Sequence, residues 1–173
     1  MITEGFIANG ATVYIASRDA KACNATASEL TSQGPGTCIA LPADLLQLSE
    51  CKRLVAEISK REKKLDVLVN NSGAAWGTPL EEFPDEQWSR ILTLNLTRAF
   101  TLTQLLLPLL EAAGKERGER GGDRPAAVIN IGSINGLTVP NLEVSSFSSN
   151  FPGSVYPSVG GTMGVSVIVK ARR

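Results

Sequence analysis

The sequence predicts an α/β fold built on a doubly wound parallel sheet. Along most of its 173 residues, short apolar segments alternate with amphipathic ones, and glycine, proline or asparagine stands between them. Uninterrupted apolar strands separated by helices are typical of parallel βαβ units that helices cover on both faces. Ligands of such sheets bind at the carboxyl ends of the strands, so we expect functional residues directly after each strand.

The first βα unit follows a turn at Asn9-Gly10. Residues 11–16 (ATVYIA) are apolar and β-branched, which predicts a buried strand. The segment Ser17-Arg18-Asp19 offers a helix cap, and the alanine-rich segment 20–33 has helical propensity up to Gly34. We therefore expect a strand, a capped helix and a glycine stop in this order.

The second unit begins with a short strand over residues 37–41, which ends at Pro42. Ser49 is expected to cap the helix that follows. The apolar positions of this helix are Cys51, Leu54, Val55 and Ile58. Their i, i+3, i+4, i+7 spacing predicts a surface helix with one buried side.

The next elements are a third strand, a long helix and a fourth strand. Residues 65–69 (LDVLV) and 126–131 (AAVINI) have the composition of buried strands. Between them a long helix is expected over residues 85–113, with Pro108 bending or ending it. Its apolar stripe comprises Trp88, Ile91, Leu92, Leu96, Ala99, Leu102, Leu106 and Leu110. The charged segment 114–124 is interpreted as a solvated loop.

The pattern changes after the fourth strand. Between Ile134 and Val169 the only charged residue is Glu143, and no helical period is present. We therefore expect a domain over residues 1–143 and an irregular tail over residues 144–173. Within this tail, residues 164–169 (GVSVIV) have the composition of a strand or of an aggregation-prone edge.

Composition argues against several kinds of site and partner. Lysine plus arginine and aspartate plus glutamate each number 17, and no basic cluster is present, so a nucleic-acid partner is not expected. The chain has no histidine, which excludes histidine-dependent triads and histidine-ligated zinc. The 3 cysteines form no CxxC pair, so we expect thiols in a reducing compartment and no metal site. No signal peptide or membrane span is recognised, so we expect a cytoplasmic protein without a membrane partner.

Polar residues near the strand ends are the candidates for a site. The Asn70-Asn71-Ser72-Gly73 segment follows the third strand and either forms a tight turn or contacts a bound cofactor. Asn95 lies on the apolar stripe, where its amide is either satisfied by a neighbouring backbone group or placed near a reaction site. Ser133 follows the fourth strand and either caps a turn or hydrogen-bonds a substrate carbonyl.

Five ordered motifs, ASRDA, PADL, LDVLVNNSG, LNLTRAF and INIGS, resemble those of the short-chain dehydrogenases/reductases. The stretch NNSGAAWGTPLEEFPDEQW resembles the branch of 3-oxoacyl-acyl-carrier-protein reductases of the rhamnolipid-synthesis type. The resemblance runs from Gly5 to about Asn141. It implies a Rossmann-like NAD(P)-binding domain that transfers a hydride between a nicotinamide cofactor and a small carbonyl, alcohol or 3-oxoacyl substrate.

The resemblance also implies the cofactor contacts. Asp44 and Leu45 would contact the adenine, and Asn71, Ser72 and Gly73 would line the cleft for the adenosine and the nicotinamide ribose. The first strand ends in Ala16 rather than in the acid that binds a ribose 2′-hydroxyl, and Arg18 is placed to meet a 2′-phosphate. NADP(H) is therefore expected in preference to NAD(H).

The catalytic positions of the family are present only in part. Asn95 would hold a proton-relay water, and Ser133 would orient the substrate carbonyl. Counting on from Ser133, the slots of the family's tyrosine and lysine fall on Phe147 and Phe151, which cannot exchange a proton. Lys170 is too distant in sequence to restore the dyad locally.

The family's first strand and its glycine-rich TGxxxGxG loop are also missing, so the resemblance is truncated at both ends. The chain opens with MITEGFIANGATV, which resembles the latter part of the helix after that loop. The missing strand would lie in the middle of the sheet, between the strands at Ala11 and Leu65. Residues 165–169 are short, apolar and β-branched, which suits a buried strand in this slot, but nothing in the sequence fixes their position. An empty slot would leave helix faces exposed and favour aggregation or dye binding.

Two functional hypotheses follow. One is an NADP(H)-dependent short-chain oxidoreductase for carbonyl or 3-oxoacyl reduction, whose catalysis is impaired in this chain. The alternative is a non-catalytic fragment or pseudoenzyme, acting at most as a weak nucleotide-binding or interaction module. In either case, a homo-oligomer through the long helix 85–113 is considered.

Overall fold

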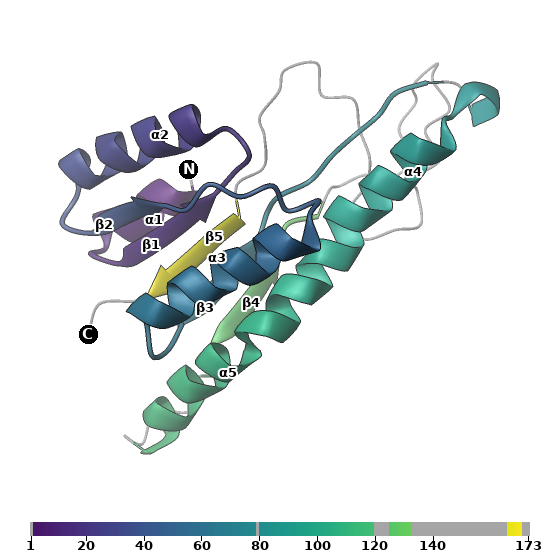
Figure 1. Cartoon of the computed structure of the whole chain (residues 1–173). Coiled ribbons are helices and arrows are strands. Elements are labelled where there is room, and N and C mark those ends of the chain that lie inside the picture. The colour runs from purple at the N-terminus through teal and green to yellow at the C-terminus, as the bar shows by residue number, and fades with distance from the viewer. Residues whose placement is uncertain (1, 79, 120–124, 133–165, 171–173) are drawn as a thin grey trace.

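The computed structural model describes residues 2–78, 80–119, 125–132 and 166–170 (Figure 1). In chain order the elements are α1 (Ile2–Ala8), β1 (Thr12–Ala16), α2 (Ala20–Gln33), β2 (Thr37–Ala40), α3 (Leu48–Arg61), β3 (Val67–Asn70), the 3-10 turn η1 (Leu80–Glu82), α4 (Asp85–Leu92), the π-helical segment η2 (Thr93–Thr97), α5 (Arg98–Glu119), β4 (Ala127–Asn130) and β5 (Ser166–Lys170). All four strands that the sequence predicts before the tail are confirmed, within two residues at each end.

The strands form one sheet in the order β2-β1-β5-β3-β4. β1 pairs with β2 and β3 with β4 in parallel, whereas β5 is antiparallel to both of its neighbours, β1 and β3. The expectation of a uniformly parallel sheet is therefore wrong for β5. β5 fills the slot between β1 and β3 that the family's first strand would occupy. The expectation of an irregular tail over residues 144–173 is therefore wrong for Ser166–Lys170.

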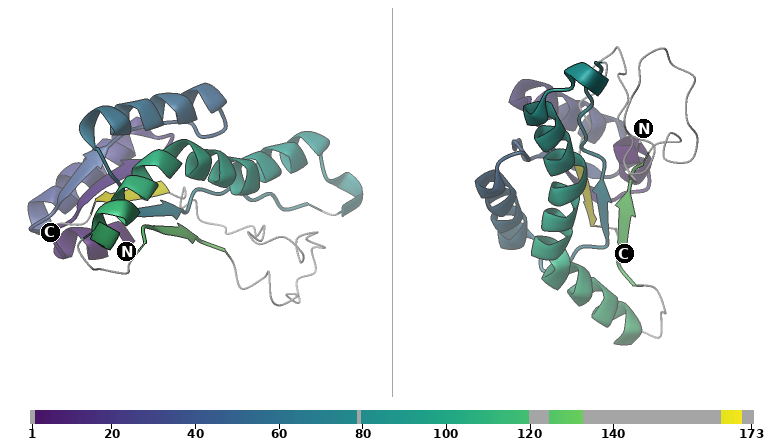
Figure 2. Two further views of the ribbon diagram at one scale, coloured as in Figure 1. Left: turned by 90° about the horizontal axis from the view of Figure 1, so that it is seen from below. Right: turned by 90° about the vertical axis from the view of Figure 1, so that its right-hand side faces the viewer.

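Helices cover the sheet on both faces, as expected for a doubly wound fold (Figure 2). α1 and α2 pack on the face that carries Val13 and Val169. α3 and α5 pack on the face that carries Leu68 and Ile168. Ile168 and Val169 of β5 each have a relative exposure of 0%, so this strand contributes to the hydrophobic core on both faces of the sheet.

Local signals set the helix ends with one exception. Asp19 caps α2, because its Oδ1 accepts a hydrogen bond from the amide nitrogen of Ala22 at 2.9 Å. Gly34 follows the last residue of α2, and a Cβ there would lie 2.7 Å from Ile7 Cγ2. The expected cap at Ser49 is wrong, because the N-cap of α3 is Gln47, two residues earlier, and it makes no side-chain cap bond.

The long helical region differs from the expected helix over 85–113 in two ways. The π-helical segment η2 separates α4 from α5, and Leu96 within it is 47% exposed instead of joining the apolar stripe. α5 runs through Pro108 to Glu119, so neither the expected stop nor the loop from residue 114 is present. Buried Leu106 and Leu110 pack on either side of the exposed proline, and this packing keeps the helix continuous.

β4 lies at one edge of the sheet, next to β3. Its four residues are all exposed, so the expectation of strands covered on both faces is wrong for β4. Val128 and Ile129, which point to opposite faces, are 40% and 41% exposed. None of the helices within the described ranges combines the length and the apolarity that crossing a membrane requires.

Candidate functional site

The loops after β1 and β2 are tied together at the carboxyl edge of the sheet. The carbonyl oxygen of Ser17 accepts a hydrogen bond from the amide nitrogen of Ala43 at 3.0 Å. The hydroxyl of Ser17 donates to the carbonyl oxygen of Asp19 at 3.3 Å, and Ser17 itself is buried. Arg18, between these two residues, is exposed. The first βα turn therefore presents its one cationic side chain to solvent from a backbone that is held on both sides.

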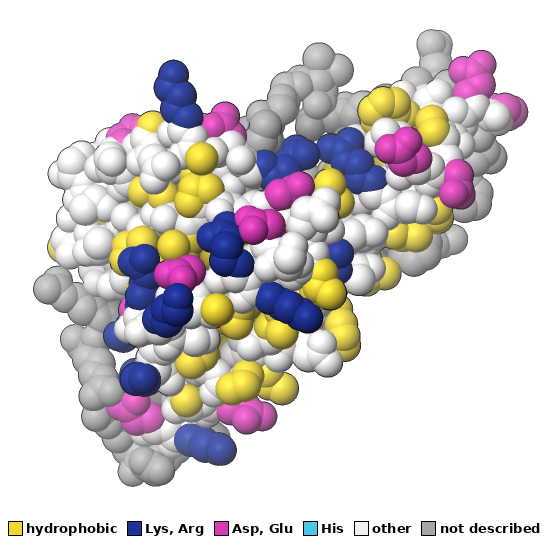
Figure 3. Space-filling view, in the orientation of Figure 1, with side chains coloured by type: hydrophobic (Ala, Val, Ile, Leu, Met, Phe, Trp, Pro, Cys, Tyr) yellow, Lys and Arg dark blue, Asp and Glu magenta, His cyan; other side chains and the backbone are white. Residues whose placement is uncertain are grey.

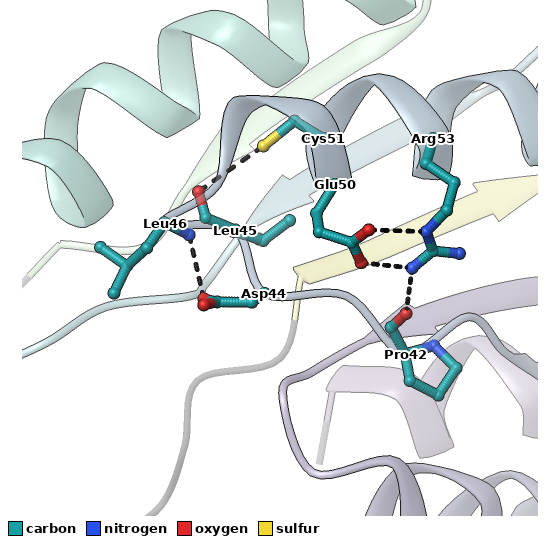
Figure 4. Close-up of polar contacts among 7 residues, drawn as sticks. All are labelled: Pro42, Asp44, Leu45, Leu46, Glu50, Cys51 and Arg53. Carbon is teal, nitrogen blue, oxygen red and sulfur yellow. Dashed lines mark hydrogen bonds and ion pairs between the residues drawn. The ribbon is translucent and has the colours of Figure 1, made fainter.

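The loop after β2 is anchored by the helices α3 and α5, and Figure 4 shows its contacts with α3. Asp44 Oδ1 accepts a hydrogen bond from the amide nitrogen of Leu46 at 3.1 Å. The carbonyl oxygen of Leu45 accepts from Cys51 Sγ at 3.6 Å and from Arg98 Nε at 2.8 Å. Arg98 Nη2 also donates to the carbonyl oxygen of Leu46 at 2.8 Å. α3 and α5 thus hold the backbone on which Asp44 and Leu45 lie.

A second set of contacts in Figure 4 fixes the start of the same loop. Arg53 on α3 pairs with Glu50, with a shortest N–O distance of 2.6 Å, and donates to the carbonyl oxygen of Pro42, also at 2.6 Å. The hydrogen bond from Arg53 lowers the pKa of the Glu50 carboxyl. Burial raises the pKa of the Cys51 thiol, which keeps it protonated as a donor to Leu45.

Asn95 in η2 contacts the loop after β3. Its Oδ1 accepts a hydrogen bond from the amide nitrogen of Ala74 at 2.7 Å, and its Nδ2 donates to the carbonyl oxygen of Ala74 at 3.0 Å. A Cβ at Gly73 would lie 3.3 Å from Asn95 Oδ1, so a side chain there would crowd this pair. The interpretation of Asn95 as an amide satisfied by backbone describes these contacts, and its role in holding water stays a prediction.

Asn70 joins the carboxyl ends of β3 and β4. Its Nδ2 donates to Asn130 Oδ1 at 2.9 Å and to Thr103 Oγ1 at 3.3 Å. Its Oδ1 is buried and has no hydrogen-bond partner among the described residues. The edge of the sheet at this point therefore holds a buried acceptor that is not used.

The described part of the chain brings together only some of the residues singled out in the sequence. Gly73 lies against Asn95, and half-buried Asn71 and Ser72 directly precede Gly73 in the chain. Ser133, Phe147 and Phe151 lie outside the described residues. Lys170 pairs with Glu62 and lies opposite Thr12, at the amino end of β1 and away from the edge that holds the candidate site.

Arg98 is a candidate that the sequence argument missed. It is half-buried and joins α5 to the carbonyl oxygens of Leu45 and Leu46. The available signal was a cation three residues after Asn95, next to an apolar stripe in LNLTRAF. Within the ranges that the structure describes, no group of three or more histidine, cysteine, aspartate or glutamate side chains is placed to hold a metal ion.

Comparison with known proteins identifies the family. The family model described as short chain dehydrogenase matches residues 1–150. The chain belongs to this family. It is 41% identical over 138 residues to the rhamnolipids biosynthesis 3-oxoacyl-[acyl-carrier-protein] reductase of Pseudomonas aeruginosa, a match that covers 80% of this chain and 51% of the relative. It is 30% identical over 141 residues to the D-beta-hydroxybutyrate dehydrogenase of Rhizobium meliloti, covering 82% of this chain and 49% of that one.

A solved structure matches the same part of the fold. The Pseudomonas aeruginosa RhlG/NADP active-site complex superposes with a TM-score of 0.73 at 39% sequence identity, over 82% of this chain and 52% of that chain. The chain therefore spans about half the length of the relatives it matches. The resemblance inferred from the five motifs and the Rossmann-like fold are confirmed.

Proposed function

We propose that the described part of this chain is the adenosine side of an NADP(H) site of a short-chain dehydrogenase of the 3-oxoacyl reductase type, and that the chain itself does not reduce a carbonyl substrate. The family match and the identity of 41% to a 3-oxoacyl reductase support the reaction class. The observation that carries the proposal is the carboxyl edge of the sheet. Loops suited to a nucleotide follow β1, β2 and β3 there, but an antiparallel strand occupies its centre.

The residues at the adenosine end fit the phosphorylated cofactor. Exposed Arg18 lies two residues after the end of β1 and has no ion pair within the described ranges, so its guanidinium is available to a 2′-phosphate. Ala16 at the end of β1 has no carboxylate for a 2′-hydroxyl. These features support NADP(H) in preference to NAD(H), consistent with the NADP named in the RhlG complex.

The centre of the edge does not fit the pyrophosphate of the cofactor. In the resembling enzymes, a glycine-rich loop leads from the central strand into a helix whose amino end binds phosphate. Here the central strand is β5, which runs in the opposite direction and begins at Ser166, opposite Ala16. A strand in this direction does not lead at the carboxyl edge into a loop and helix of the family type, so the described residues support weak binding at most.

The other end of the family pattern, after the fourth strand, lacks the proton donor at its expected position. The tyrosine and lysine slots fall on phenylalanines in the sequence, at Phe147 and Phe151. A general acid contributes a factor of about 10² to 10⁴ in rate, so its loss supports a chain without useful turnover. For these reasons we favour the non-catalytic alternative for the activity of this chain.

One observation favours a second role in association. Phe100 on α5 is 67% exposed, and Leu96 and Leu107 on the same helical region are each 47% exposed. Figure 3 shows a different pattern over α3, where charged side chains of both signs are interspersed, as in the Lys60–Glu57 pair. The helical region 85–113 is therefore the surface through which a homo-oligomer would form.

Nucleotide binding by the full chain tests this function. Titration calorimetry with NADPH and NADH should show weak binding of NADPH and weaker binding of NADH. Arg18→Ala should lower the NADPH affinity about tenfold and leave NADH binding unchanged, because one charge-assisted phosphate contact is lost. Lys21→Ala, an exposed cation on α2, is the matched control.

Turnover is measured on the same preparation with a 3-oxoacyl thioester. The rate of NADPH oxidation should equal that of a control without protein. A rate clearly above this control would show that the chain carries its own proton donor. Equal affinities for NADPH and NADH would instead refute the role of Arg18.

A further inference from the structure

β5 is a short strand enclosed on both sides. It pairs with β1 from Thr12 opposite Lys170 to Ala16 opposite Ser166, and with β3 from Val67 opposite Val169. The amide nitrogen of Asp66 also donates to the carbonyl oxygen of Val169 at 3.1 Å. Without β5, two facing strand edges in the middle of the sheet would lack backbone partners. The gap is therefore a site with a defined ligand, an extended strand of about this length.

A buried carboxylate lies at the amino end of this gap. Glu62 follows α3 directly and is 6% exposed. Its Oε1 accepts a hydrogen bond from the Tyr14 hydroxyl at 2.8 Å, and its Oε2 pairs with the ammonium group of Lys170. Since each oxygen has one specific partner, a strand without lysine at this position would leave a buried charge unpaired.

The burial of β5 sets the remaining requirement. Ile168 packs in the core under α3 and α5, and Val169 packs in the core under α1 and α2. Neither side chain retains any exposure. Combined with the contact at Glu62, the gap fits a strand with apolar residues on both faces and a lysine at its end.

We propose that the gap between β1 and β3 is a strand-acceptor site in which Glu62 selects an apolar strand ending in lysine, and that it accepts Ser166–Lys170 from a second copy of this chain as well as from its own. The strand pairings and the ion pair to Glu62 all join β5 to elements that are distant in sequence. The same contacts therefore form when the strand belongs to another copy, which is the condition for exchange of an identical element between protomers.

The strand of the same chain has the advantage of its tether, which raises its effective concentration. Exchange is therefore revealed by making the intramolecular pairing unfavourable and the intermolecular one favourable. Glu62→Lys places two ammonium groups at the contact, and Lys170→Glu places two carboxylates there. In an exchanged heterodimer of the two variants, the lysine introduced at position 62 meets the glutamate introduced at position 170, and the native pair forms at the other end.

The experiment compares four samples refolded from urea: each single variant, their equimolar mixture, and the double variant. Each single variant should melt below the wild type, and the double variant should recover much of the loss as a monomer. The mixture should contain about tenfold more dimer by light scattering than either variant alone, because two like-charge contacts are replaced by two ion pairs. Glu57→Lys, the same charge change on α3, is the matched control and should form no dimer with Lys170→Glu.

The outcomes separate the two parts of the proposal. A double variant that is no more stable than the single ones overturns selection by Glu62. Recovery in the double variant without dimer in the mixture overturns acceptance from a second copy. If Glu62→Lys does not fold alone, its folded yield after refolding with Lys170→Glu is measured instead. A yield restored only by that partner supports exchange, and an unchanged yield overturns it.

Discussion

Gly36 lies where the backbone of the first βα unit leaves no room for a side chain. A Cβ at this position would lie 2.4 Å from the carbonyl oxygen of Ala11 and 2.7 Å from that of Ile7. The amide nitrogen of Gly36 also donates to Ile7 at 3.0 Å, so the loop cannot move away without losing this hydrogen bond. The close approach of α1 and the start of β2 therefore requires a residue without a side chain at position 36.

Gly36→Ala should therefore lower the free energy of unfolding by about 1–3 kcal/mol, because overpacking forces the backbone to shift. Gly5→Ala is the matched control, since a Cβ there meets nothing within 4 Å and lies in α1. It should raise the free energy of unfolding by about 0.5–1 kcal/mol through helix propensity. Urea unfolding of both variants measures the contrast, and a similar effect of the two substitutions would contradict it.

Cys38 and Tyr14 are two of the buried groups that make stability depend on pH in the alkaline range. Burial, aided by the neighbouring Cys23, raises the pKa of Cys38 from 9.0 to about 11. Burial and the hydrogen bond to Glu62 raise the pKa of Tyr14 above its ordinary value of 10.0. Both groups lose their protons more readily in the unfolded chain, so their contribution to stability is present below the unfolded pKa and is lost as the pH rises towards the folded one.

The free energy of unfolding should consequently fall between pH 9 and pH 11 and continue to fall above that range. Cys38→Ala should flatten the decline between pH 9 and pH 11. Tyr14→Phe should flatten the decline above pH 10 and leave the lower part intact. Urea unfolding at a series of pH values measures both slopes, and a Tyr14→Phe variant with the wild-type slope above pH 10 would refute the assignment.

Among the elements, α5 shows how packing outweighs local propensity. Pro108 lies inside this helix, where it cannot donate the usual backbone hydrogen bond and its ring crowds the preceding turn. The helix nevertheless continues to Glu119, because buried leucines on both sides of the proline pack on α3 and the sheet. The proline therefore acts against the stability of a helix that tertiary contacts maintain.

Pro108→Ala should raise the free energy of unfolding by about 1–3 kcal/mol, since it restores a backbone donor at an exposed position. Glu111→Ala, an exposed substitution one turn further on, should change it by no more than about 0.5 kcal/mol. Thermal or urea unfolding compares the two. A loss of stability in Pro108→Ala would show that the geometry imposed by the proline is required for packing.

For the molecule as a whole, the position of β5 determines which apolar surface is left. The sequence predicted dye binding on the assumption of an empty central slot. Since β5 fills this slot, the exposed apolar residues lie elsewhere, on the helical region 85–113 and at the β4 edge, which carries Val128, Ile129 and Ile131 at 40%, 41% and 45% exposure. Exposed apolar residues on an edge strand favour association of this kind.

Replacing Val128 and Ile129 together by threonine should reduce the fluorescence of a bound hydrophobic dye at least about twofold, because both faces of β4 then become polar. Leu48→Thr is the matched control, since Leu48 is 43% exposed on α3, away from this edge. Dye fluorescence measured at equal concentrations compares the three chains. Unchanged fluorescence in the double variant would show that the dye binds elsewhere.

Short-range patterns were sufficient to predict most elements and the family. The apolar runs of β1 to β4, the Asp19 cap and the ordered motifs all act between residues that are close in sequence, and the structure and the family match confirm them. The same local reasoning placed the candidate residues after the strands, because the carboxyl ends of parallel strands share one edge.

Contacts between distant residues decided the rest. The direction of β5, the ion pair between Glu62 and Lys170, which are 108 residues apart, and the hold of Arg98 on Leu45 all form only when the chain is packed. Packing likewise kept α5 continuous through Pro108. A local sequence pattern does not predict such contacts, since the free energy of each one depends on burial and on pairing between residues that only the folded molecule brings together.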